Sequence, residues 1–332
     1  MKSNYNQLGQ YIEMVSRTNS DLKYGIEDVR GCSNTKQMMQ TRANLIGRTY
    51  EKFIVLRPQE FVFNRRTTRN GEKIGMAYNN TDREYIFTND YVAFRVKQEY
   101  LDKLLPDYLY LFFCRDEFDR YARYKSTGSA TEFFNWEDMC AVPFEIPPMD
   151  FQQLVVNAYK VLNKRIETKQ KINDNLEATA QSLFQEQFAA FYNENELPDG
   201  YSIATLDSLC SIKGGKRLPA DGELLDTPTA HPYIRVRDLG SNRYVCLTNQ
   251  FQYIDEETHS AISRYIVNTN DIVISIVGTI GLIGKIHTSL NNANLTENCV
   301  KLANIHTVTP DYLYYTCLLY TSPSPRDGAT SR

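Results

Sequence analysis

The amino-acid sequence predicts an α+β protein in which two similar mixed β/α domains are joined by a long central helix. One segment, 151–192, contains no Gly or Pro and repeats apolar residues at helical spacing. The chain on either side consists of short β-branched and aromatic runs separated by Gly, Asn and Pro. Landmarks in the first part recur in the same order in the second, which indicates one fold used twice.

Composition sets the broad class. The 332 residues are 42% hydrophobic and 23% charged, which is typical of a globular chain large enough for two domains. No run approaches the roughly 18 to 20 apolar residues of a membrane span, and the polar start lacks the apolar run of a signal peptide. We therefore expect a cytoplasmic protein with no membrane partner.

Charge and cysteine usage narrow the class further. The formal net charge is -3, so any contact with nucleic acid has to depend on local basic clusters. The 7 cysteines and 4 histidines are scattered without a CxxC pair. This pattern favours reduced thiols and argues against a zinc site.

The first domain is expected to span 1–149. "FVFN" (61–64) has the pattern of a buried strand after a turn, and Asn70-Gly71 predicts a tight hairpin. Its landmarks in chain order are Leu8-Gly9-Gln10-Tyr11-Ile12, "YGIEDVRG" (24–31), "FIVLRPQEFVFN" (53–64), "YIFTNDYVAFRV" (85–96) and "PDYLYL" (106–111).

The central segment, 150–192, is predicted to be a single amphipathic helix. Pro147 and Pro148 fix its start because proline cannot lie in a helix interior, and Asp150 can cap the first turn. About 40 residues at ~1.5 Å each give a rod of roughly 60 Å. This exceeds the usual globular range, so we expect the apolar stripe to pair with another long helix, with a plain core helix as the alternative.

The second domain is expected to span 193–316. Its landmarks are Leu206-Asp207-Ser208-Leu209-Cys210, "YIRVRDLG" (233–240), "YIVNTNDIVISI" (265–276), "NLTENCVKL" (294–302) and "PDYLYY" (310–315). Each lies roughly 200 residues after its counterpart, and both series end in Pro-Asp-Tyr-Leu-Tyr. The order of the matches predicts a duplicated domain.

Catalytic motifs do not stand out. "GTIGLIG" (278–284) has the spacing G-x-x-G-x-x-G rather than the dinucleotide fingerprint, and no phosphate-binding P-loop occurs. The sequence also lacks HExxH, a Gly-x-Ser-x-Gly elbow and the close acidic cluster with Lys of a metal-dependent nuclease. We predict a chain that is not an enzyme and binds neither metal nor cofactor.

Local basic clusters are the candidate sites. Such residues can contact phosphates or read guanine edges, although a solvated face is the alternative. Two copies of one module held apart by a rod suit two short sites on one duplex. The candidate DNA-binding residues are Arg65, Arg66, Arg69 and Lys73 in the first domain, and Lys213, Lys216, Arg217, Arg235 and Arg237 in the second.

The arrangement resembles the specificity subunit of type I restriction-modification systems. The sharpest match is "STGSATEFFNWEDMCAVPFEIPPMDFQQLVV" (126–156), where Thr-Gly-Ser leads through Trp136 and acidic residues to a double proline and a Gln-containing helix. "LCSIKGGKRLP", "YIRVRDL" and "PDYLYY" are similar to signatures of the second recognition domain. One departure is the turn, which has Ile-Pro-Pro-Met where Leu-Pro-Pro-Leu is frequent.

The resemblance implies a non-catalytic DNA-recognition subunit with a role in host defence and DNA methylation. Two target recognition domains each read half of a bipartite double-stranded DNA target, and an antiparallel coiled coil sets the spacing. Methylation (M) subunits using S-adenosylmethionine and restriction (R) subunits using ATP and Mg dock on this scaffold. The subunit-docking residues would be Leu154, Val155, Ala158, Leu162, Ile166, Ile172, Leu176 and Leu183.

Two other readings stay open. The chain can be the recognition portion of a fused methyltransferase-nuclease whose catalysis lies on another segment. It can also be a coiled-coil protein-protein adaptor that does not touch DNA.

The end of the sequence departs from the duplication. After "PDYLYY" no Thr-Gly-Ser segment, double proline or second long helix follows, and Cys317 to Asp327 match the translation of a transposase-based sequencing adaptor. We therefore expect residues 317–332 to be non-native. We also expect the specificity subunit that the sequence resembles to be truncated at its C-terminus, with an incomplete second recognition domain.

Overall fold

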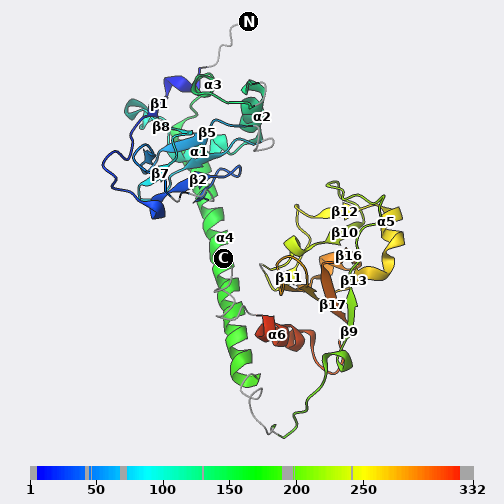
Figure 1. The fold of residues 1–332 in the computed structure, drawn as a ribbon. Helices are drawn as coiled ribbons and strands as arrows, with labels where there is room; N and C mark the ends of the chain where they lie inside the picture. The colour runs from blue at the N-terminus through cyan, green and yellow to red at the C-terminus, as the bar shows by residue number, and fades with distance from the viewer. Residues whose placement is uncertain are drawn as a thin grey trace. The chain divides into compact units, whose positions relative to one another are not determined.

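The computed structural model describes residues 6–41, 45, 47–67, 73–128, 131–188, 197, 199–240 and 242–321. The chain divides into two compact units, Met1–Thr168 and Lys169–Arg332 (Figure 1). Helix α4, Met149–Phe188, contributes its two ends to the two units.

The first unit is built on a four-stranded antiparallel sheet in the order β1-β8-β5-β6. Its strands are β1 Ile12–Val15, β5 Phe61–Asn64, β6 Met76–Tyr78 and β8 Tyr91–Val96. Two smaller antiparallel sheets pair β2 Arg30–Cys32 with β3 Met38–Gln40, and β4 Ile54–Leu56 with β7 Tyr85–Phe87. The short helices are α1 Pro106–Phe113, α2 Asp116–Lys125 and α3 Trp136–Cys140.

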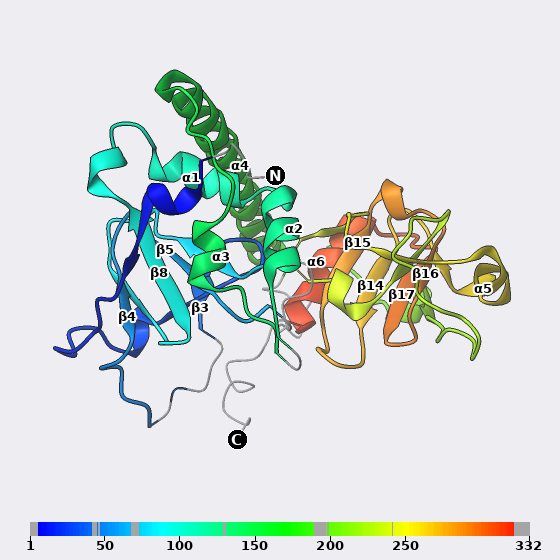
Figure 2. The ribbon, with the colours of Figure 1, turned by 90° about the horizontal axis from the view of Figure 1, so that it is seen from above.

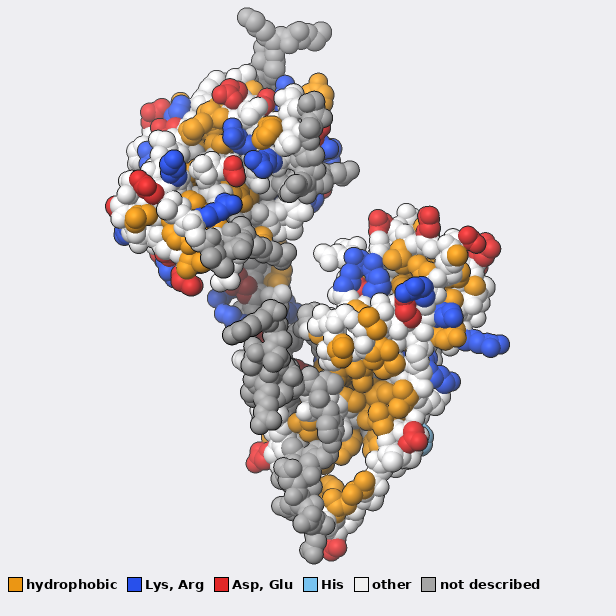
Figure 3. Space-filling view, viewed as in Figure 1, with side chains coloured by type: hydrophobic (Ala, Val, Ile, Leu, Met, Phe, Trp, Pro, Cys, Tyr) orange, Lys and Arg blue, Asp and Glu red, His pale blue; other side chains and the backbone are white. Residues whose placement is uncertain are grey.

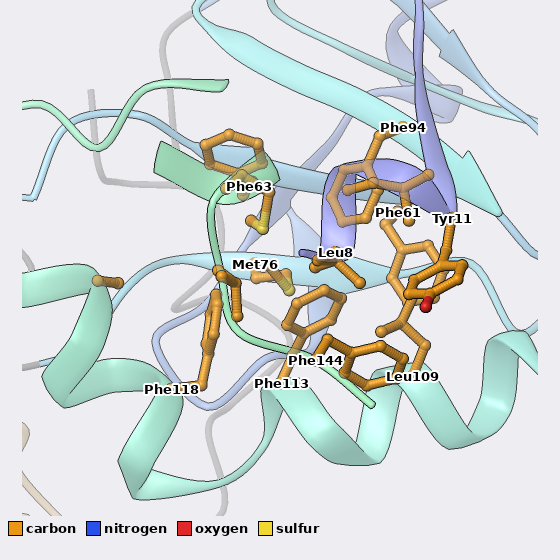
Figure 4. Packing of buried hydrophobic residues seen from close by; sticks show 14 of the residues in the cluster. Leu8, Tyr11, Phe61, Phe63, Met76, Phe94, Leu109, Phe113, Phe118 and Phe144 are labelled. Atoms are coloured by element: carbon orange, nitrogen blue, oxygen red, sulfur yellow. The ribbon is translucent and has the colours of Figure 1, made fainter. Parts of the chain in front are cut away.

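Strand β5 is buried on both faces, as its continuous apolar run predicts. Phe61 and Phe63 point into the main core, where the ring centroids of Phe61 and Phe94 lie 5.0 Å apart (Figure 4). Val62, which alternates with them, belongs to a second cluster with Leu56 and other residues. The sheet is therefore the middle layer of this unit.

The second unit contains two sheets. The larger has the order β11-β15-β14-β17-β9 and the smaller β12-β10-β16-β13. Strands β14, β15 and β17 lie side by side, with α6 against one face (Figure 2). The elements are β9 Ser211–Gly214, β10 His231–Ile234, β11 Tyr244–Val245, β12 Gln252–Ile254, β13 Ile266–Val267, β14 Ile272–Ser275, β15 Ile283–Ile286, β16 Ala293–Leu295, β17 Cys299–Ala303, α5 Glu256–Ala261 and α6 Pro310–Thr321.

The two units share their sheet topology. The order β1-β8-β5-β6 recurs as β9-β17-β14-β15, with every neighbouring pair antiparallel. The small sheet β4-β7 has its counterpart in the pairing of β13 with β16. Helices α1 and α6 both begin at the proline of a Pro-Asp-Tyr-Leu-Tyr sequence. The predicted fold class of two similar mixed domains and one long helix is confirmed.

The duplication extends to the turn before the central strand. Gln59 and Asn270 occupy equivalent left-handed positions, with φ of 65° and 72°. A carboxylate closes each turn, because the Arg57 amide donates to Glu60 Oε2 over 2.8 Å and the Asn268 amide to Asp271 Oδ2 over 2.9 Å.

Helix α4 is anchored in the first unit by one buried amide. The Gln152 side chain donates from Nε2 to the carbonyl oxygens of Lys103, at 2.7 Å, and Pro147, at 2.8 Å. Its Oε1 accepts from the Leu105 amide at 2.9 Å. The prediction of a helix over 151–192 holds up to Phe188, and residues 189–192 lie outside the described residues.

We predict that Gln152→Ala lowers the free energy of unfolding of the first unit by about 2–3 kcal/mol, because three backbone groups lose their partner in the interior. Trp136, the single tryptophan, lies against the core of this unit, so its fluorescence reports unfolding there. Gln153→Ala is the matched control. Gln153 is exposed and bonds only within the helix, to Asn157, so a similar loss for both variants would refute the anchor.

Candidate nucleic-acid interface

One end of the main sheet carries some of the basic candidates in each unit. Strands β1 and β5 run in the same direction because β8 is antiparallel to both, so their carboxyl ends meet the amino end of β8. Strands β9, β14 and β17 repeat this arrangement. We call this end of the sheet the basic edge, made of residues 64–66 and 90 in the first unit and 215–217 and 297 in the second.

In the first unit the basic edge follows β5. The Arg65 carbonyl accepts from the Phe134 amide at 2.9 Å, and the Arg66 amide donates to Asn64 Oδ1 at 3.0 Å. The exposed Arg66 guanidinium lies 3.8 Å from the Asp90 carboxylate. The structure therefore brings Arg65 and Arg66 together at this edge.

Lys73 and Arg69 stand apart from this pair. Lys73 is exposed, and its Nζ lies 3.5 Å from Asp116 on α2. Arg69 and the expected Asn70-Gly71 hairpin lie outside the described residues.

The Thr-Gly-Ser signature lies beside this edge. The Thr67 amide donates to the Glu132 carbonyl at 3.0 Å, which pairs the backbone after Arg66 with the segment before Trp136. Gly128 has φ +149°, and a Cβ there would lie 2.0 Å from the Thr131 carbonyl oxygen. The glycine of the signature is thus required by a close backbone approach.

In the second unit the basic edge follows β9. The amides of Gly215 and Lys216 donate to the carbonyls of Cys299, at 3.0 Å, and Leu295, at 2.8 Å. Arg217 then pairs with Glu297, with 2.8 Å between Nε and Oε1. Lys213, in strand β9, is exposed.

Arg235 and Arg237 follow β10. The Arg235 side chain is only 19% exposed and bonds to Gln252. Arg237 is more exposed and donates to the Gln250 carbonyl at 3.3 Å. The Arg235 amide donates to Asp238 Oδ2 at 2.8 Å, so Asp238 caps this turn. Burial makes Arg235 the least available of the described candidate contacts.

The basic residues of the two units share an edge but not a loop. In the first unit they follow β5, whose counterpart β14 is followed by the exposed apolar residues Ile276 and Val277. In the second unit they follow β9, whose counterpart β1 is followed by Arg17, and Arg17 is paired with Glu60.

Sequence reasoning missed the carboxylates of this edge. Asp90 stands directly before β8, and Glu297 stands just before its counterpart β17. Each faces an arginine of a different strand. The sequence shows an acidic residue just before each strand, in Thr-Asn-Asp (88–90) and in Thr-Glu-Asn (296–298), although at different positions of the triplet.

The apolar stripe of α4 is open along most of its length. Val155 is half-buried and Ala158 is exposed. The larger stripe residues are 51–67% exposed, namely Leu154, Leu162, Ile166, Ile172, Leu176 and Leu183. Helix α6 covers Phe184 instead, with 5.3 Å between the ring centroids of Phe184 and Tyr312. Among the described residues, no other helix exceeds the 12 residues of α6.

Other kinds of site find little support in the described part of the chain. No group of three or more His, Cys, Asp or Glu side chains there is placed to hold a metal ion. None of the described helices is both long and apolar enough to cross a membrane. On the face drawn in Figure 3, the Lys and Arg side chains of the first unit are interspersed with Asp and Glu.

A protein-family model of the type I restriction modification DNA specificity domain matches residues 32–178. Residues 32–178 therefore belong to this domain family. The matched region contains the basic edge of the first unit, the Thr-Gly-Ser signature and most of α4.

Individual relatives of the type I specificity family are more distant. The specificity subunit of the type I restriction enzyme MjaIX from Methanocaldococcus jannaschii is 24% identical over 189 residues. That match covers 53% of this chain and 43% of the relative, so it spans less than half of the relative's length.

Two solved structures are also similar. The HsdS subunit from Thermoanaerobacter tengcongensis is 16% identical, with 98% of this chain and 82% of that chain covered and a TM-score of 0.37. The S subunit of a type I restriction-modification system from M. genitalium is 15% identical, with coverage of 96% and 79% and a TM-score of 0.45.

Asp238 gives the second unit a predicted pH dependence. Burial raises the pKa of Asp238 to about 6, and nearby Arg237 acts in the opposite direction. The unfolded carboxyl titrates near 3.9, so the folded protein holds the proton more tightly. Stability from this group is present below about pH 4 and is lost as the pH rises through 6, by on the order of 1–3 kcal/mol.

Asp238→Asn should remove that loss, since its amide oxygen still accepts from the Arg235 amide. Urea unfolding followed by circular dichroism at several pH values between 4 and 7 measures the difference. Parallel stability curves for the two proteins would contradict the prediction.

Proposed function

We propose that this chain is the DNA sequence-specificity subunit of a type I restriction-modification complex, in which each unit reads one half of a bipartite double-stranded target. The observation that carries the proposal is the repeated basic edge, with an exposed arginine facing a carboxylate in each copy. Guanidinium groups suit both phosphate contacts and guanine edges. Candidate contacts are Arg65, Arg66, Arg69, Lys73, Lys213, Lys216, Arg217 and Arg237, and the largely buried Arg235 acts in support.

We propose that α4 sets the spacing between the half-sites and docks the methylation subunits. In support, its exposed apolar stripe would be costly to leave in water, and long helices bury such stripes against other helices. We assign residues 1–149 and 193–316 to the two recognition domains and 150–192 to the helix between them.

The proposed subunit catalyses nothing itself. Methylation subunits would supply S-adenosylmethionine chemistry, and restriction subunits would use ATP and Mg, in the cytoplasm where the host DNA lies. A fused methyltransferase-nuclease would place these activities on the same polypeptide instead.

Retention of duplex DNA tests the function directly. The chain is purified with its methylation subunits and bound to a pool of duplexes, and strand-resolved methylation of host DNA gives the motif independently. Recovery of one bipartite motif by both routes is expected. Retention without sequence dependence would favour the protein-protein adaptor.

The basic edge of the first unit should contribute to the salt dependence of binding. Replacing Arg65, Arg66 and Arg69 together by Ala should lower the slope of log affinity against log salt by roughly 1 to 3, because each phosphate contact contributes about 0.9. Filter binding across a salt series measures it.

Arg95→Ala is the control for that slope. Arg95 is exposed at the other end of β8, where it pairs with Glu13. An unchanged slope in the triple variant, or an equal change in the control, would show that Arg65, Arg66 and Arg69 do not contact phosphates.

The stripe makes a separate prediction. Replacing Leu162 and Leu176 by Glu should abolish co-purification of the methylation subunits and leave the melting temperature of the chain unchanged, since both side chains are exposed. Replacing Lys164 and Lys171 by Gln on the exposed polar face is the control and should leave assembly intact. If the Glu variant assembles normally, the methylation subunits do not dock on the apolar stripe of α4.

A further inference from the structure

Arg217 is both exposed and oriented, an unusual combination for a long side chain. It is 82% exposed, yet its Nε donates to Glu297 Oε1 at 2.8 Å. The other carboxylate oxygen, Oε2, accepts from the Thr296 hydroxyl at 3.0 Å. The hydroxyl thus holds the carboxylate, and the carboxylate holds the guanidinium.

The backbone that carries Arg217 is also fixed. A Cβ on Gly215 would lie 2.0 Å from the Thr296 carbonyl oxygen, so only glycine allows this approach. The Lys216 amide donates to the Leu295 carbonyl at 2.8 Å, and the Lys216 carbonyl accepts from the Tyr233 hydroxyl at 2.8 Å. Because Arg217 is already ordered, binding a ligand to it costs little side-chain conformational entropy.

The fixed guanidinium presents two terminal nitrogens to solvent. Because Nε is occupied by Glu297, Nη1 and Nη2 remain, and within the described residues no protein acceptor bonds to either. These two donors match the paired acceptors O6 and N7 of guanine in the major groove.

The adjacent carboxylate disfavours a phosphate at this position. A phosphate is attracted by the net charge of a cation, and Glu297 at 2.8 Å cancels most of that charge while repelling the anion. The neutral guanine edge depends on hydrogen-bond geometry, which the pairing improves.

Among the described candidates, Arg66, Arg235 and Arg237 have a different arrangement. The Arg66 guanidinium lies 3.8 Å from its carboxylate, beyond hydrogen-bond distance. Arg237 uses Nη2 to bond the Gln250 carbonyl, and Arg235 is largely buried.

We propose that Arg217 reads a guanine in the half-site bound by the second unit, with Glu297 as its positioning residue. This rests on the proposed function, since it names one base contact of that recognition. The half-site of the second unit then contains a G·C pair whose replacement weakens binding.

The test is selection from a duplex pool with randomised positions, using the full chain with its methylation subunits. The wild-type complex should enrich one G·C position in one half of the motif. Arg217→Ala and Arg217→Lys should both lose that preference by about 10- to 100-fold and leave the other half unchanged. Lysine keeps the charge but not the paired donors, so its failure identifies bidentate contact.

Glu297 is tested by rescue. Glu297→Ala should weaken the preference at the same G·C position, because the guanidinium is no longer held. Glu297→Gln retains an acceptor oxygen for Nε and should largely restore it. Lys213→Ala, at an exposed residue of strand β9, should weaken all positions equally.

Different failures have different meanings. If Arg217→Ala weakens every duplex by one factor and lowers the salt slope, Arg217 contacts phosphate and the guanine proposal is wrong, while the proposed function stands. If the wild-type complex enriches no motif, both fail. Circular dichroism melting verifies folding, and Arg217→Lys and Glu297→Gln keep the test valid should an Ala variant unfold.

Discussion

The basic edges depend on a buried carboxylate that closes the turn before each central strand. Glu60 is held by the Arg57 amide and the Arg17 guanidinium, and Asp271 is held by the Asn268 amide and lies near Lys301. Each carboxylate stabilises a turn in which one residue, Gln59 or Asn270, has a left-handed backbone conformation. Residues other than glycine rarely adopt this conformation. The turn sets the register of β5 and β14, and therefore the height at which their carboxyl ends meet β8 and β17. A one-residue slip of β5 would exchange the faces of the sheet to which Arg65 and Arg66 point.

Much of this fold could be predicted from local patterns. The continuous apolar run of β5, the Pro-Asp-Tyr-Leu-Tyr helices and the long helix without Gly or Pro are all set by nearby residues. The pairs Arg66–Asp90 and Arg217–Glu297 could not be predicted, because each joins residues far apart in sequence through sheet register. Gln152 was visible as part of a signature, but its role as a buried anchor depends on the carbonyls of Lys103 and Pro147.

The two units share a sheet scaffold but differ in the side chains at its ends. Where the first unit carries Arg65 and Arg66 after β5, the second carries Ile276 and Val277 after β14. Its basic residues come instead from the neighbouring parallel strand at the same edge. Changing which loop carries the basic residues, while keeping them at the same end of the sheet, changes the side chains that face a ligand and leaves the core unaltered. One fold that recognises two different half-sites would need this property.

The pairing of arginines with carboxylates at these edges affects sequence specificity and overall DNA affinity in different ways. Arg66 and Arg217 each face a carboxylate, so these two arginines add little net positive potential to a chain whose formal charge is already -3. Counterion release is the main source of non-specific affinity for DNA, and a paired arginine contributes less to it than a free one. Orientation by a carboxylate improves hydrogen bonding to a base while it lowers attraction to phosphate. An edge of this kind discriminates between sequences better than it holds DNA, so under the proposed function tight binding would require additional positive charge from outside this chain.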